Sequence, residues 1–179
     1  FGDGAAAALL QKGYRKNVIL ETHMITDGSF AEDVAVYNIG NNIIDFKLVD
    51  NSPIMLDVRD YQSMKERLDP ITFNNFITVI AKSVEKSGYK VEDIDFIAPI
   101  FMKRSILLNI LDKFNLTEEN SFVLEEYGHC QSADAFISIV QGQKLNRIKD
   151  GDLVVMLGAG TGYTWAATTI KWGDYSEAN

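Results

Sequence analysis

Three stretches of the chain carry apolar residues at the spacing of an amphipathic helix. The first helical face consists of Phe73, Phe76, Ile77, Ile80 and Val84. The second consists of Leu107, Ile110, Leu111 and Phe114, and the third of Ala133, Phe136, Ile137 and Val140. Asp69-Pro70 predicts the start of the first helix, as an N-cap followed by proline, and Gly88 predicts its end.

Between these helices, stretches that are largely apolar predict strands. The predicted strands cover residues 17–25, 94–100, 121–128, 151–162 and 163–172, and the fourth of them runs into a glycine-rich loop. Residues 26–29 (TDGS) predict a turn. Helices and strands alternate through the second half of the chain, which is typical of an α/β layered arrangement in one domain or half-domain.

The composition is that of a globular protein, because 46% of the 179 residues are hydrophobic and 23% are charged. The net charge of −8 argues against nucleic-acid binding through bulk electrostatics, and the basic clusters at residues 103–104 and 144–149 are typical of a solvated face. No apolar run approaches the ~18 residues of a membrane span. The single cysteine is typical of a reducing compartment. We therefore expect a soluble, cytoplasmic protein that binds neither nucleic acid nor a membrane.

The stretch YGHCQSAD, residues 127–134, places a histidine beside the only cysteine, with an aspartate five residues on. These are the residue types of a base, a nucleophile and an orienting carboxylate. Each also has a structural interpretation: Cys130 as a small buried apolar residue, His129 as a hydrogen-bonded structural histidine, and Asp134 as an acid at a helix N-terminus. His23 lies in the early predicted strand, away from this cluster, and is interpreted as structural.

Four stretches match one protein family in their order and spacing. They are FGDGAAAALL (1–10), MITDGS (24–29), EEYGHCQSAD (125–134) and IKDGDLVVMLGAGTGYTWAATTIKW (148–172). In that order they resemble a Phe-Gly-Asp-Gly-Ala signature, a short Asp-Gly-Ser turn, a Gly-Asn-Thr-Ser-Ala-Ala-Ser loop, and a closing strand, glycine loop and strand. These four signatures are those of the β-ketoacyl-acyl-carrier-protein synthase III (3-oxoacyl-ACP synthase III) family, which has the thiolase fold.

The resemblance implies a duplicated protein whose two α/β halves stack into an αβαβα sandwich. Residues 1–14 would be the last strand region of the N-terminal half, and residues 15–179 the C-terminal thiolase-like domain. The chain opens on Phe1 without a methionine, so we expect a piece of a longer polypeptide with the nucleophilic cysteine upstream, and Cys130 is not the aligned nucleophile. The resemblance also implies a homodimer or heterodimer, acyl-CoA or acyl carrier protein as substrates, and no cofactor or metal.

Two further active-site positions of the family are changed in this sequence. Ile100 stands where the family has the histidine of a His-Gln-Ala-Asn run, and His129 stands where it has the asparagine of Gly-Asn-Thr. In the family those side chains donate hydrogen bonds to a thioester oxygen during decarboxylation, and losing one such donor costs about 10²–10³ in rate. His129 and Asp134, with the upstream cysteine, would instead suit acyl transfer to a hydroxyl or an amine.

The glycine loop GAGTG, residues 158–162, precedes a strand, whereas dinucleotide-binding loops precede a helix, so no nucleotide site is predicted. The resemblance implies that backbone N–H groups at Gly160 and Thr161 help to form an oxyanion hole. A tight turn within a sheet is the structural alternative. Ala159 stands where relatives often carry an aromatic residue, which indicates a wider acyl pocket.

The sequence therefore predicts a transferase similar to 3-oxoacyl-ACP synthase III, of the fatty acid or polyketide type. It would take an acyl group from acyl-CoA or acyl-ACP onto the upstream cysteine and pass it to a carbon, oxygen or nitrogen nucleophile. The present chain alone is expected to be inactive. Two alternatives stay open: a non-catalytic partner subunit of a heterodimeric condensing enzyme, and an acyl-binding scaffold.

Overall fold

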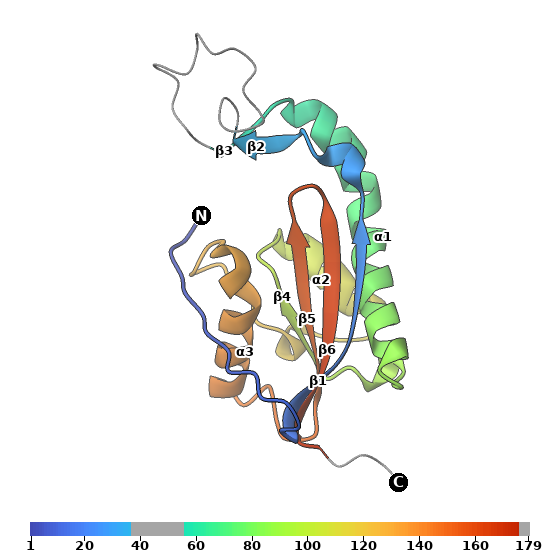
Figure 1. The fold of residues 1–179 in the computed structure, drawn as a ribbon, viewed down its shortest axis with the longest axis vertical. Coiled ribbons are helices and arrows are strands. Elements are labelled where there is room, and N and C mark those ends of the chain that lie inside the picture. Colours follow the sequence, from blue (N-terminus) through green and yellow to red (C-terminus); the bar gives the residue numbers. More distant parts are fainter. Residues whose placement is uncertain (37–55, 176–179) are drawn as a thin grey trace.

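A four-stranded sheet forms the centre of the computed structural model, which describes residues 1–36 and 56–175. The strand order is β1 (Lys16–Thr26), β6 (Thr164–Asp174), β5 (Leu153–Gly160) and β4 (Phe96–Pro99) (Figure 1). β4 and β5 are parallel, whereas β6 is antiparallel to both of its neighbours. These strands confirm the predictions for residues 17–25, 94–100, 151–162 and 163–172.

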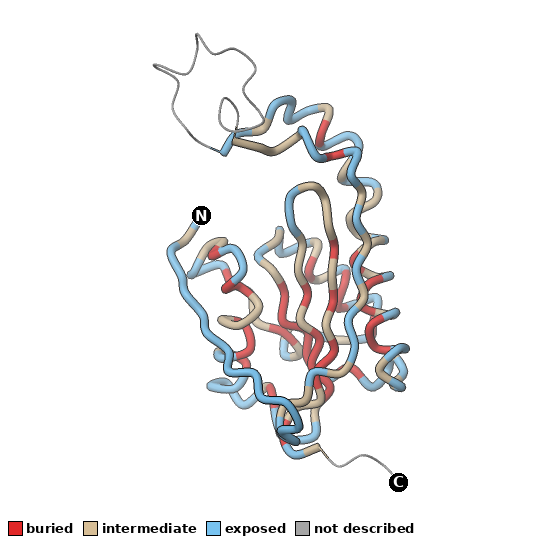
Figure 2. The backbone as a smooth tube through the Cα atoms, in the orientation of Figure 1, coloured by how far each residue is buried: buried red, intermediate tan, exposed pale blue. Residues whose placement is uncertain are grey.

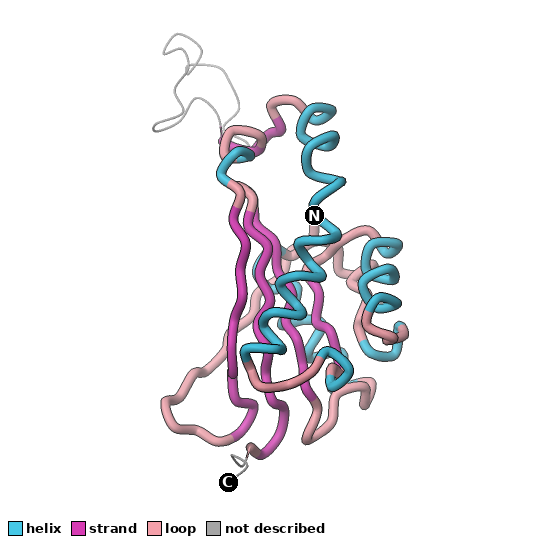
Figure 3. The backbone as a smooth tube through the Cα atoms, turned by 90° about the vertical axis from the view of Figure 1, so that its right-hand side faces the viewer, coloured by secondary structure: helices cyan, strands magenta, loops and turns pink. Residues whose placement is uncertain are grey.

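Helices cover both faces of the sheet (Figures 1 and 3). α1 (Tyr61–Lys86) and α2 (Arg104–Lys113) share one buried cluster with alternate β5 residues, among them Val155 and Leu157. α3 (Asp134–Lys144) packs on the other face, where Val154 joins the second cluster. Successive side chains of a strand point to opposite faces, so the two clusters lie on opposite sides of the sheet, and burial is concentrated along its strands (Figure 2). The predicted αβα layers of a thiolase-like half are confirmed.

Smaller elements connect these layers. β2 (Val34–Val36) and β3 (Leu56–Val58) pair antiparallel outside the main sheet. The short 3₁₀ helices are η1 (Gly28–Phe30), η3 (Val91–Asp93), η4 (Glu118–Asn120) and η5 (Gln131–Ala133). The turn predicted after β1 is confirmed, because Asp27 Oδ1 accepts a hydrogen bond from the Ser29 N–H at 2.9 Å. Hydrogen bonds from Ser29 hold the pKa of the Asp27 carboxyl below its ordinary value of 3.8.

The first helix begins well before the predicted site at Asp69-Pro70, so that prediction is wrong. The N-cap is Asp60, whose Oδ1 accepts a hydrogen bond from the Ser63 N–H at 2.9 Å, and Pro70 lies inside α1. Met64, Leu68 and Ile71 continue the apolar spacing toward the N-terminus, with Met64 buried and the other two partly buried against the core, so the helical period was present before Asp69. The prediction failed because Asp-Pro has the residue types of an N-cap and a first helical position, and here it lies inside the helix. The predicted end at Gly88 is confirmed, since α1 ends at Lys86.

Residues 121–128 do not form the predicted strand. Ser121 makes one parallel bridge with Ile97 of β4, and the chain then turns. The turn forms because the Tyr127 N–H donates to the Leu124 carbonyl at 3.0 Å. Leu124 is buried, so its side chain fits an apolar strand pattern although its backbone starts a turn.

α3 packs on the sheet through a face other than the predicted apolar one. Ser138, Ile139 and Gly142 are buried, whereas Val140 is 46% exposed. The small side chains of Ser138 and Gly142 let α3 approach β4 closely, which the period of large apolar residues does not indicate. The predicted stripe through Val140 therefore faces away from the sheet.

Residues 1–15 run along the outer side of α3 without forming a helix or a strand (Figure 1). Residues 5–7 line a shallow hollow there with Phe136 and Ile137 of α3. The assignment of residues 1–14 to the last strand region of an N-terminal half stays a prediction, because these residues form no strand in the described part of the chain.

Substituting Gly142 with alanine is expected to destabilise the protein by about 1–2 kcal/mol, because overpacking outweighs the gain in helix propensity. A Cβ at this position would lie 2.7 Å from Phe96 Cζ and 2.9 Å from Ile148 Cδ1, and the Phe96 ring is fully buried. Urea unfolding measures the loss. Gln143→Ala, at the next and exposed position of α3, is the control and should change stability by less than about 0.5 kcal/mol. Equal stability of the two variants would contradict the close packing of α3.

Candidate active site

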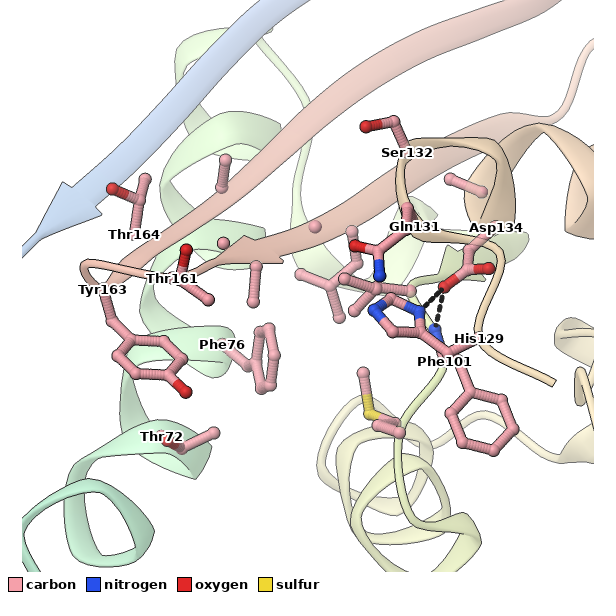
Figure 4. A pocket seen from close by; sticks show the side chains of 18 of the residues that line it. Thr72, Phe76, Phe101, His129, Gln131, Ser132, Asp134, Thr161, Tyr163 and Thr164 are labelled. Carbon is pink, nitrogen blue, oxygen red and sulfur yellow. Dashed lines mark hydrogen bonds and ion pairs between the residues drawn. The ribbon is translucent and has the colours of Figure 1, made fainter. Parts of the chain in front are cut away.

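A cavity of about 720 Å³ lies at the carboxyl ends of the parallel strands β4 and β5 (Figure 4). Apolar side chains form much of its wall, among them Phe76, Ile100, Met102, Ile106 and Leu157. Polar side chains lie at two places on the wall: His129, Gln131 and Asp134 near the start of α3, and Thr72, Thr161 and Thr164 across the cavity. The carboxyl ends of parallel strands are the usual ligand-binding edge of an α/β sheet.

The centre of the polar group is a buried carboxylate that receives three N–H groups. Asp134 Oδ2 lies 2.6 Å from His129 Nδ1 and accepts from the Phe101 N–H at 2.8 Å, and Oδ1 accepts from the Cys130 N–H at 2.7 Å. The Asp134 side chain is only 1% exposed, against 24% for His129. Three donors offset the cost of burying this charge, and they fix the loop before α3 against the end of β4.

The contact with Asp134 fixes which ring nitrogen of His129 carries hydrogen. A carboxylate only accepts hydrogen bonds, so Nδ1 is the donor and Nε2 keeps its lone pair in the neutral imidazole. The ring edge opposite Asp134 faces the open middle of the cavity (Figure 4). This arrangement allows Nε2 to accept a proton from a bound nucleophile.

Two aromatic residues beside His129 were not identified from the sequence. The Phe101 ring is stacked on the imidazole at a centroid distance of 6.2 Å and an interplanar angle of 26°. The Phe1 ring lies 5.7 Å away at 33°. Because the Phe101 N–H also binds Asp134, this residue holds both members of the pair. The signal in the sequence is its place directly after Ile100, at the end of β4.

The cavity brings together the other residues predicted for the site. Ile100 lies on its wall and presents an aliphatic side chain that donates no hydrogen bond. Ala159, Gly160 and Thr161 line the same cavity at the end of β5, on the strand next to β4. The oxyanion role of the N–H groups at Gly160 and Thr161 stays a prediction, as does the wider acyl pocket expected from Ala159.

Cys130 and His23 lie outside the cavity wall. Cys130 is buried, with its Sγ 3.6 Å from the Tyr127 carbonyl oxygen, in agreement with the interpretation of a small buried apolar residue. His23 lies on β1, where its Nδ1 is 3.0 Å from Lys86 Nζ of α1. The two histidines of the chain therefore differ in setting, and only His129 faces the cavity.

Tyr163 lies on the cavity wall, and its burial raises the pKa of the phenol above its ordinary value of 10.0, with a smaller contribution from the Asp33 carboxylate. The folded state therefore holds this proton more tightly than the unfolded chain. Stability should fall as the pH rises from about 10, the pKa of the unfolded chain, through the higher pKa of the folded state.

Unfolding of wild type and of Tyr163→Phe by urea, at pH values from about 8 to 11, measures this effect. The difference in unfolding free energy should be constant below about pH 9 and should shift in favour of the phenylalanine variant above about pH 10. Curves that stay parallel across this range would contradict the assignment.

Two absences concern the part of the chain that the structure describes. Within residues 1–36 and 56–175, no helix is both long enough and apolar enough to cross a membrane. In the same residues, no cluster of three or more histidine, cysteine, aspartate or glutamate side chains is arranged to hold a metal ion.

The chain is similar to known synthases in sequence and in fold. Residues 84–172 match the family described as 3-Oxoacyl-[acyl-carrier-protein (ACP)] synthase III C terminal. The β-ketoacyl-[acyl-carrier-protein] synthase III of Aquifex aeolicus (strain VF5) is 28% identical over 174 residues, which cover 96% of this chain and 50% of that protein. The crystal structure of 3-oxoacyl-[acyl-carrier-protein] synthase III from Aquifex aeolicus VF5 gives a TM-score of 0.69 at 23% identity, covering 90% of this chain and 46% of that one. The synthase III structure from Pseudomonas aeruginosa PAO1 gives 0.72 at 15% identity, covering 89% and 47%.

The chain spans about half the length of the curated relatives it matches. The matched structures share its α/β fold, and the matched family segment contains β4, α2, the His129–Asp134 loop, α3, β5 and most of β6. The chain belongs to the 3-oxoacyl-[acyl-carrier-protein] synthase III family and corresponds to its C-terminal half.

Proposed function

We propose that this chain is the C-terminal half of an acyltransferase that moves an acyl group from an acyl-CoA or acyl-ACP thioester to an oxygen or nitrogen nucleophile. The observation that carries the proposal is the His129–Asp134 pair on the wall of the cavity. The names of the relatives, β-ketoacyl-[acyl-carrier-protein] synthase III, support the class of donor. The residue that carries the acyl group would be a cysteine of the N-terminal half.

In the proposed transfer, His129 Nε2 accepts the proton of the acceptor's hydroxyl or amine while that oxygen or nitrogen attacks the acyl carbonyl. The bond between the acyl carbon and the cysteine sulfur then breaks, and the departing thiolate takes the proton from the imidazolium. The products are an ester or an amide and the free thiol. Asp134 orients the ring and stabilises the imidazolium through Nδ1, the role of the aspartate in a catalytic triad. Backbone N–H groups at Gly160 and Thr161 would stabilise the tetrahedral oxyanion.

Carbon–carbon bond formation is disfavoured in this account. Decarboxylation of a malonyl thioester builds up enolate-like charge that needs hydrogen-bond donors, and the aliphatic side chain of Ile100 supplies none. Loss of one donor costs about 10²–10³ in rate, so transfer that does not pass through an enolate is the reaction that this cavity favours.

Ile100 also favours a second candidate of a different class, a non-catalytic subunit of a heterodimeric condensing enzyme. In such a pair an active partner would carry the chemistry, and the cavity of this subunit would serve no reaction. A subunit of this kind forms a complex with its partner and accepts no acyl group itself. A homodimer would therefore count against this second candidate, whereas a heterodimer would be compatible with both proposals.

An acceptor comparison with the full-length protein tests the proposed reaction. The protein is incubated with an acyl-CoA donor and then offered an alcohol, an amine or a malonyl thioester, and the products are identified by mass spectrometry. We expect ester or amide formation to exceed release of carbon dioxide by at least about tenfold. Condensation with the malonyl thioester as the fastest reaction would contradict the proposal.

A further inference from the structure

We infer that the side-chain amide of Gln131 is a substrate-binding group of this cavity, which donates a hydrogen bond to the carbonyl oxygen of the acyl group during transfer. This assignment deepens the proposed function and rests on it. Gln131 and His129 both line the cavity, two positions apart in the same loop, and Figure 4 shows the Gln131 amide directed into the cavity beside the imidazole.

The backbone of Gln131 is held in an unfavourable conformation. Its φ of 57° lies in the left-handed region, where residues other than glycine and asparagine are uncommon. Among the described residues, the other non-glycine residues with positive φ are Asn17, Asn115 and Asn146, all of the type that tolerates this region best. Gln131 is therefore the exception.

The left-handed backbone of each asparagine is explained by its place in the fold. The left-handed backbone of Gln131 has no such explanation. Asn115 and Asn146 follow the last turns of α2 and α3, where a left-handed residue ends a helix. Asn17 Oδ1 accepts a hydrogen bond from the Gly173 N–H at 2.8 Å. By contrast, within residues 1–36 and 56–175 the Gln131 amide has no hydrogen-bond partner in the protein.

The loop around Gln131 is fixed from both sides, so its conformation is imposed by the fold. The Cys130 N–H is bound to Asp134 Oδ1 at 2.7 Å, and the Ala133 N–H donates to the Cys130 carbonyl at 3.2 Å. The same bonds hold the His129–Asp134 pair. A strained residue whose polar side chain is unpartnered, exposed to a cavity and fixed beside a general base is arranged to bind substrate.

Gln131 would add a side-chain donor to the backbone N–H groups of Gly160 and Thr161, which the proposed function assigns to the same oxyanion. The neighbouring side chains do not supply this hydrogen bond, because Asp134 only accepts, His129 uses Nδ1 for Asp134 and Nε2 for the proton, and Ile100 donates nothing. A carboxamide N–H₂ aimed at the acyl carbonyl oxygen would stabilise the negative charge that develops there when the acceptor attacks. No proton is transferred by Gln131, and no bond to it forms or breaks.

The test compares Gln131→Met, which keeps the length but loses the donor, with Gln131→Gly, which also relieves the left-handed backbone. In the full-length protein, both variants should lower kcat for acyl transfer by about tenfold to 10²-fold with the KM of the acceptor changed less than about twofold. The glycine variant should melt at the same temperature as wild type or higher. Gln62→Met, on an exposed part of α1 outside the cavity, is the control and should keep wild-type kcat.

The outcomes separate this assignment from the proposed function. A stable glycine variant with wild-type kcat would overturn the role of Gln131 and leave the transferase intact. A wild-type protein that transfers no acyl group to any acceptor would overturn the proposed function, and this assignment with it. Slow turnover in a glycine variant that is as stable as wild type would be the supporting result. If Gln131 had only a structural role, a variant of wild-type stability would keep the wild-type kcat.

Discussion

Replacing His129 with alanine is expected to lower kcat for acyl transfer by on the order of 10²-fold, because the reaction loses its general base. The imidazole is the one basic side chain among the described residues that line the cavity, and Asp134 holds it with Nε2 toward the open space. Steady-state rates of ester or amide formation by the full-length protein measure the effect.

His23→Ala is the matched control for this substitution. His23 is the second histidine of the chain and lies on β1, against Lys86 and outside the cavity wall. Its removal should change kcat by less than about twofold, since surface substitutions away from a site have small effects. Equal rates for wild type and His129→Ala would show that the imidazole has no part in the reaction and would remove the support for oxygen or nitrogen transfer.

Replacing Asp134 with alanine is expected to cost about 3 kcal/mol of stability as well as activity. The carboxylate is 1% exposed and binds the N–H groups of Phe101 and Cys130 besides the His129 ring, so its removal leaves one buried and one partly buried backbone donor without an acceptor. Chemical denaturation of the full-length protein measures the loss, and kcat should fall because the ring of His129 is no longer held.

Asp69→Ala provides the comparison for stability. Asp69 is an exposed aspartate within α1, and its substitution should change the unfolding free energy by less than about 0.5 kcal/mol. If Asp134 were only an acid at a helix N-terminus, its loss would cost about 0.3–1 kcal/mol. A measured loss within that range would contradict its place at the centre of the site.

The sequence pointed to His129 and Asp134 as candidates, whereas Phe101, Gln131 and the contacts that join these residues were not predictable from it. The spacing of His129 and Asp134 places both in one loop, but their contact depends on the left-handed turn at Gln131, which no pattern of residue types indicates. The third partner of the carboxylate, the Phe101 N–H, is 33 positions away in sequence and is brought in by the end of β4. Long-range backbone contacts of this kind leave no local signal.

The fold was predicted where apolar periodicity is strong and missed where backbone hydrogen bonds decide. β4 and the first part of β5 are buried, so their continuous apolar stretches indicated parallel strands correctly. The start of α1 was predicted wrongly because Asp69-Pro70 resembles an N-cap with a first-turn proline, whereas Asp60 caps the helix and Met64, Leu68 and Ile71 already lie at helical spacing. At residues 121–128 an apolar stretch became a turn, because the Leu124 carbonyl accepts a local hydrogen bond.

The most direct test of the central claim is the intact mass of the full-length protein after incubation with a panel of acyl-CoA donors. The proposed function predicts a mass increase equal to one acyl group, lost again when an alcohol or amine acceptor is added. A well-folded protein that gains no mass with any donor would contradict the transferase and would favour the non-catalytic partner subunit.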